Sequence, residues 1–73
     1  MTTDKSTSFQ ERVIAELIAL SGNVARLEVF LDTPVFAGLP KDERGRLVVQ
    51  LRFMQGYEAV LLQRIEAFQG VAP

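Results

Sequence analysis

The first half of the chain repeats apolar residues with the period of an α-helix. Between Phe9 and Leu31 there is no proline, and the apolar residues are spaced 4, 3, 4, 3 and 4 apart. The residues of this seam are Val13, Leu17, Leu20, Val24, Leu27 and Leu31. Such an unbroken heptad predicts a helix over residues 8–31, with a length of about 36 Å. Ser8, followed by Glu11, fits a capping box at its start, and we expect the small polar residues 1–7 to form a flexible tail.

The second half shows the same period after a short linker. Thr33 followed by Pro34 is typical of the cap and first residue of a helical turn, which we predict over residues 34–38. Pro40 suits the first turn of another helix, predicted over residues 40–69. The seam of this helix consists of Leu47, Leu51, Met54, Leu61, Ile65 and Phe68, and Glu58 interrupts its heptad.

Both predicted helices carry more apolar surface than a hairpin needs. One apolar stripe on each helix is enough to hold two helices together, but a second row runs beside each seam. These rows are Ile14, Ile18, Ser21 and Ala25 in the first helix and Val49, Phe53, Gly56 and Val60 in the second. Copies of the same chain are their simplest partners. The pattern therefore predicts an all-α single domain over residues 1–73: an antiparallel two-helix hairpin with a short helical turn in its linker, assembling into a compact homo-oligomer.

Composition favours self-association and excludes several chemistries. The chain has 73 residues, of which 48% are hydrophobic, and it contains no cysteine, histidine or tryptophan. So small a domain is marginally stable alone, and neither a disulfide nor a Cys/His zinc site is available to stabilise it. The nucleophile–base pairs of the common hydrolases are also excluded.

The charge balance argues against duplex nucleic acid as a partner. The net charge is −1, whereas proteins that bind duplex DNA normally carry a basic excess. No stretch approaches the length of about 20 apolar residues that a membrane span requires, and the first residues lack the apolar run of a signal peptide. We therefore expect a cytoplasmic protein with no membrane partner.

The acidic residues show no catalytic or metal-binding pattern. Asp42 and Glu43 lie in a predicted first turn, where they stabilise the positive end of the helix dipole. No two-metal spacing and no convergent cluster is found among four further glutamates, which are Glu16, Glu28, Glu58 and Glu66. We expect no enzymatic activity, no metal and no cofactor.

Two glycines lie inside the predicted long helices. Gly22 and Gly56 each cost about 1 kcal/mol relative to alanine, so each indicates either close helix packing or a backbone that approaches a ligand. An antiparallel hairpin that turns near Phe36 would place Gly22 beside Gln50 and Gly56 beside Glu16. The two glycines would then face each other only between subunits.

Arginines and aromatic residues are the remaining candidates for binding. The arginines are consistent with solvated helix faces and ion pairs, but Arg64 lies among apolar residues, where it could cross an interface or bind a phosphate. Phe9 could begin the seam of the first helix or stack on a base. The Tyr57 hydroxyl could form a hydrogen bond across an interface.

A family resemblance covers most of the chain, roughly residues 9–68. It is carried by the string RLEVFL from Arg26 to Leu31, by Gln50 and Leu51 with Met54 and Tyr57, and by Leu61 with Arg64 and Ile65. This combination resembles the helical hairpin domain of phage anti-CBASS sponge proteins, a domain shared with the anti-Thoeris sponges. The compact anti-CBASS type is the better likeness.

The resemblance implies a phage protein that antagonises bacterial immunity in the host cytoplasm without being an enzyme. Such sponges are homo-oligomers, typically hexamers, and they sequester cyclic di- and trinucleotide messengers without cleaving them. The ligand-binding residues that it implies are Phe9 for base stacking, Ser21 and Gly22 for a small step beside the ligand, Asn23, Arg26, and Arg64 for a phosphate. Asn23 stands where the family has a lysine.

Two other functions are compatible with a helical hairpin. A helical oligomerisation or scaffold module would use the same apolar stripes to bind the helix of a protein partner. A small DNA-binding regulator is disfavoured by the charge and by the lack of a helix-turn-helix step.

Overall fold

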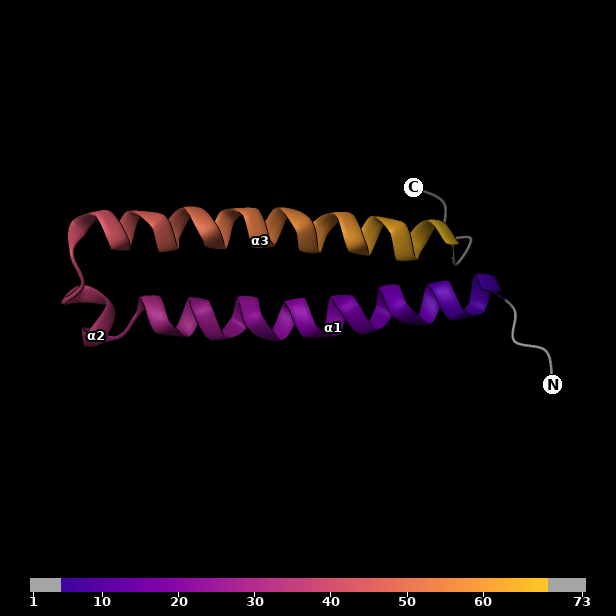
Figure 1. Cartoon of the computed structure of the whole chain (residues 1–73), viewed down its shortest axis with the longest axis horizontal. Helices are drawn as coiled ribbons and strands as arrows, with labels where there is room; N and C mark the ends of the chain where they lie inside the picture. The colour runs from indigo at the N-terminus through magenta and orange to yellow at the C-terminus, as the bar shows by residue number, and fades with distance from the viewer. Residues whose placement is uncertain (1–4, 69–73) are drawn as a thin grey trace.

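The chain folds as a helical hairpin. A computed structural model describes the backbone of residues 5–68 and the side chains of residues 9–68. Its elements are α1 (Lys5–Leu31), α2 (Pro34–Ala37) and α3 (Lys41–Phe68). The long helices α1 and α3 run antiparallel side by side, and α2, which connects them, lies at the closed end beyond the end of α1 (Figure 1). The prediction of an all-helical fold with two packed long helices is confirmed, and residues 5–68 contain no strand.

Helix α1 begins three residues before the predicted start, at Lys5. Residues 5–7, expected in the flexible tail, are helical, because no proline or glycine separates them from the heptad seam. Ser8 therefore lies inside the helix, and the capping box expected with Glu11 does not mark its beginning. Residues 1–4 of the expected tail lie outside the described residues.

Helix α2 is a single turn that is fixed to the end of α1. Thr33 has extended backbone, and its hydroxyl oxygen accepts a hydrogen bond from the Phe36 N–H at 3.2 Å, as an N-cap does. The same hydroxyl donates to the Phe30 carbonyl at 2.6 Å. The rings of Phe30 and Phe36 meet edge to face, with centroids 6.0 Å apart. The helix ends at Ala37, one residue before the predicted end.

Helix α3 begins one residue after Pro40. The Pro40 carbonyl accepts a hydrogen bond from the Arg44 N–H at 3.0 Å, so this proline immediately precedes the first helical turn. Asp42 and Glu43 occupy that turn, as predicted. The predicted last residue of the second helix, 69, lies outside the described residues.

The core is the seam between α1 and α3. Its buried residues are Val13, Leu20, Val24 and Leu61. Partly buried residues packed against them are Leu17, Leu51, Met54, Ile65 and Phe68. All of these residues belong to the two heptad seams, so periodicity identified the core correctly.

The second apolar rows are covered only in part within one hairpin. In the α1 row, Ile14 and Ser21 are half-buried but Ile18 is 68% exposed, and in the α3 row Phe53 is 76% exposed. Outside these rows, Val29 on α1 is also 69% exposed. The hairpin therefore presents large apolar side chains to its surroundings on both long helices. Within residues 5–68, neither long helix contains a segment with the length and hydropathy needed to cross a membrane.

The register of the two helices is fixed by polar contacts across the hairpin. Ser21 Oγ donates a hydrogen bond to Glu58 Oε2 at 2.5 Å, and Gln55 Nε2 donates to Glu28 Oε2 at 3.1 Å. Helix α2 carries the chain past the end of α1, so α3 starts farther out than α1 ends (Figure 1). Each α1 residue consequently faces a later part of α3 than a symmetrical turn would give.

This register corrects the expected positions of the helical glycines. Gly22 does not lie beside Gln50, because its neighbour Ser21 contacts Glu58. Gly56, two residues before Glu58, lies at the same level of the hairpin as Gly22, and not beside Glu16. The prediction failed because it treated the linker as a symmetrical turn.

Candidate functional site

Phe9 and Arg64 are brought together at the open end of the hairpin. Phe9 lies in the first turns of α1, and Arg64 lies near the end of α3. The Arg64 Cζ lies over the Phe9 ring, 5.3 Å from its centroid, which is a cation–π contact. Phe9 is 45% exposed and lies outside the buried core, so it does not simply extend the seam.

The pair can make both contacts that the sequence analysis expects of its members: base stacking by Phe9 and phosphate binding by Arg64. A guanidinium that lies over a ring makes no hydrogen bond to a carboxylate in that contact, so its N–H groups can donate to the oxygens of a phosphate. Aromatic and guanidinium faces both stack on bases. Arg64 is exposed, so these groups remain accessible in the isolated hairpin.

A second group of sequence-predicted residues lies in the middle of α1. Arg26 Nη2 donates a hydrogen bond to Asn23 Oδ1 at 2.5 Å. The Arg26 guanidinium also lies across Gly22: a Cβ placed on that glycine would be 3.5 Å from Nη1. The absent side chain of Gly22 therefore leaves room beside an arginine, and Arg26 supplies a positive charge next to Asn23.

Ser21 faces the interior of the hairpin. Its hydroxyl donates to the half-buried Glu58 across the helix pair, so it is engaged by the protein itself. The sequence analysis treated Glu58 as an interruption of the heptad and as an acidic residue without a catalytic pattern, and not as a partner of Ser21. The contact could have been predicted from the sequence. A carboxylate at a seam position needs a hydrogen-bond donor, and a small hydroxyl residue in the facing helix can supply it.

The two groups are too far apart to form one pocket in a single hairpin. Phe9 and Gly22 are thirteen residues apart on α1, which corresponds to about 20 Å along the helix axis. Arg64 contacts Phe9, whereas Arg26 contacts Asn23. The six residues predicted from sequence therefore form the Phe9–Arg64 pair, the Gly22–Asn23–Arg26 group, and Ser21 bonded to Glu58.

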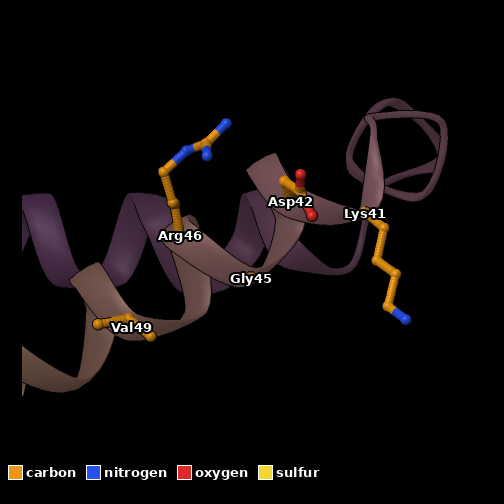
Figure 2. Close-up of a pocket in the computed structure, with 5 residues that line it drawn as sticks. All are labelled: Lys41, Asp42, Gly45, Arg46 and Val49. Carbon is orange, nitrogen blue, oxygen red and sulfur yellow. The ribbon is translucent and has the colours of Figure 1, made fainter.

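An open hollow at the start of α3 is lined by none of these six residues. Its lining residues are Lys41, Asp42, Gly45, Arg46 and Val49. Figure 2 shows its lining side chains, and those of Lys41 and Arg46 extend in different directions. Arg46 is engaged in an ion pair with Glu43 at 2.9 Å. In the described part of the chain, no group of three or more acidic side chains is arranged to hold a metal ion.

A comparison with protein-family models gives a match over most of the chain. The model described as Sequestin matches residues 7–67, a range that includes both candidate groups. No curated protein matches the chain. No solved structure matches it either.

Proposed function

We propose, since the chain belongs to the Sequestin family, that it sequesters cyclic di- and trinucleotide messengers of CBASS-type bacterial defence without cleaving them. The family name itself fits a sequestering role. In this proposal the protein is a phage antagonist of immunity that acts in the bacterial cytoplasm as a homo-oligomer, a hexamer, and not as an enzyme. The observation that carries the proposal is the Phe9–Arg64 contact.

A cyclic oligonucleotide presents flat bases around a ring of phosphates. The Phe9–Arg64 pair can recognise both, because a base stacks on a ring or guanidinium face while N–H groups hold a phosphate oxygen. Capture of this kind forms and breaks no covalent bond. The messenger stays intact but no longer reaches its effector.

The Gly22–Asn23–Arg26 group is the candidate for a further contact with such a ligand. The Asn23 amide can hydrogen-bond a base edge or a phosphate, and the adjacent Arg26 guanidinium brings the charge that asparagine lacks. Arg26 thus supplies a positive charge beside Asn23, which stands where the family has a lysine.

Homo-oligomerisation belongs to the same proposal. The exposed apolar rows on both long helices need partners, and the two candidate groups are too distant to meet within one hairpin. A symmetric assembly presents the same contact several times, which suits a ligand built from repeated nucleotides.

Calorimetry with a panel of cyclic di- and trinucleotides tests the proposed function. We expect at least one of them to bind the folded oligomer, and heat denaturation of the complex should release that nucleotide chemically unchanged. The linear dinucleotide of the same bases is the matched control ligand. A well-folded oligomer that binds no cyclic nucleotide, or releases a cleaved product, would contradict the proposal.

The exposed apolar rows also support a second candidate, a scaffold module that binds the helix of another protein. The two candidate functions differ in whether the purified protein contains a bound nucleotide. A sponge purified from cells that make the messenger should yield intact nucleotide on denaturation. A scaffold should yield none and should fail to bind the nucleotide panel.

A further inference from the structure

One apolar stripe on α3 consists of Val49, Phe53, Gly56 and Val60. These residues are spaced 4, 3 and 4 apart, so they share one face of the helix, and that face is not covered by α1. Phe53 is 76% exposed, whereas a Cβ placed on Gly56 would meet no atom within 4 Å. The stripe therefore carries a protruding ring beside a notch.

Nothing within the hairpin explains a glycine at position 56. Glycine destabilises a helix interior, and the open space around Gly56 shows that no neighbouring element requires the missing side chain. The helix backbone at Gly56 is open to close approach by another chain. A residue that is costly within the hairpin and unexplained by it points to a contact outside the hairpin.

The stripe is complementary to its own reverse, because its order is Val, Phe, Gly, Val in one direction and Val, Gly, Phe, Val in the other. When two α3 helices lie antiparallel with a two-fold axis between positions 54 and 55, Val49 lies opposite Val60, and Phe53 lies opposite Gly56. Each ring then faces a notch, and each valine faces a valine. The geometry points to a second copy of this chain as the occupant: we propose that α3 packs antiparallel on α3 of that copy through this stripe.

The exposed area and the charge are consistent with this occupant. The chain exposes 5577 Å². A compact monomer of its mass would expose about 4,500 Å². The excess of about 1,100 Å² is comparable with the roughly 800 Å² that each partner buries in an interface of standard size. The stripe contains no charged residue, and the net charge of −1 causes little repulsion between copies.

Cysteine cross-linking tests the pairing directly, because the chain has no cysteine of its own. In the double variant Val49→Cys with Val60→Cys, mild oxidation should give a covalent dimer on a denaturing gel. The two positions are about 16 Å apart on their own helix, so a disulfide within one chain is excluded. Each single variant is the matched control and should stay monomeric on the gel.

Three results would overturn this packing. The double variant could fail to cross-link, or Val49→Cys alone could cross-link as efficiently as the pair, which would mean a different register. A wild-type chain that sediments as a monomer would overturn it as well.

Filling the notch is a second test that does not depend on oxidation. Gly56→Leu should lower the assembly mass measured by sedimentation velocity, while the helical circular dichroism stays unchanged, since a Cβ at this position would meet no other part of the hairpin within 4 Å. Ala59→Leu, also exposed on α3 but outside the stripe, is the control and should keep the wild-type mass. An unchanged mass for Gly56→Leu would contradict the contact.

This inference deepens the self-association in the proposed function but does not rest on the ligand. Nucleotide binding without cross-linking in the double variant would contradict the α3 contact alone. Cross-linking in the expected register without nucleotide binding would contradict the sponge function alone.

Discussion

At the residue scale, Arg64 is held by an aromatic ring and not by a carboxylate. Its guanidinium lies over Phe9, and no acidic partner within salt-bridge distance neutralises it in the described part of the chain. A guanidinium that lies over a ring keeps its hydrogen-bond donors available, whereas an ion pair would occupy them. In the proposed function, these donors would hold a phosphate of the ligand.

Arg64→Ala should weaken nucleotide binding and leave the assembly intact. A hydrogen bond to a charged group contributes about 1.5–3 kcal/mol, so the dissociation constant should rise roughly 10- to 150-fold by calorimetry. Arg52→Ala, which also removes an exposed arginine from α3, is the control and should bind normally. An assembly that dissociates on Arg64→Ala would show that Arg64 is structural.

The two members of this pair were identified from sequence, but their contact was not. Phe9 was open to two interpretations, and Arg64 was identified because apolar residues surround it in the sequence and because the family resemblance includes it. Their meeting depends on which parts of α1 and α3 lie side by side at the open end. No heptad pattern specifies that alignment, because the pattern repeats every seven residues.

At the element scale, a heptad pattern specifies which face of each helix is buried but not how the two helices are aligned, and this explains which part of the fold was predictable. The seams of α1 and α3 were identified correctly because burial follows the helical period. Their relative register was not, because α2 displaces the start of α3 past the end of α1 (Figure 1). Glu58 was therefore seen as a defect in a seam and not as the partner of Ser21.

Loss of the hydroxyl at position 21 should destabilise the hairpin. Ser21→Ala leaves the half-buried Glu58 carboxylate without its donor, which should lower the free energy of unfolding by about 1–3 kcal/mol. Urea denaturation followed by circular dichroism measures this. The double variant Ser21→Ala with Glu58→Leu should recover stability, because it replaces both polar partners with apolar ones at a seam position. A single variant as stable as the wild type would show that the hydrogen bond contributes nothing.

The Thr33 cap should stabilise the closed end of the hairpin, because its hydroxyl joins α2 to the end of α1. Thr33→Ala removes both the bond from the Phe36 N–H and the bond to the Phe30 carbonyl, and loss of an N-cap costs about 1 kcal/mol. Thermal unfolding should show a lower midpoint for Thr33→Ala. Thr33→Ser keeps the hydroxyl and should stay close to the wild type. Equal midpoints for all three proteins would contradict a role for this cap.

At the scale of the whole molecule, the hairpin is a thin structure with few fully buried side chains. The sequence correctly indicated surplus apolar residues on both long helices. Each helix carries a second apolar row beside its core seam, and a two-helix fold can bury only one row of each helix. The sequence did not indicate what covers those rows. The α3 packing proposed above would match the ring of Phe53 to the notch at Gly56, and periodicity does not describe such a match of large and small residues.

The unfolding midpoint should rise with protein concentration. If the hairpin is completed by copies of itself, assembly stabilises the folded state by mass action. Differential scanning calorimetry over a hundredfold range of concentration should show a steady increase in the midpoint. Gly56→Leu provides the comparison, because its midpoint should depend less on concentration. A wild-type midpoint that is independent of concentration would mean that the hairpin is stable alone.

The contact between Phe9 and Arg64 also has a consequence for the order of events during protein synthesis. The two residues are separated by nearly the whole of both long helices, so a nascent chain that has released only α1 carries the ring without the guanidinium. A hairpin truncated before Arg64 would likewise expose Phe9 without its cationic neighbour. Ribosome-bound or truncated copies should therefore lack the paired group, and only chains translated past the last turns of α3 would possess it.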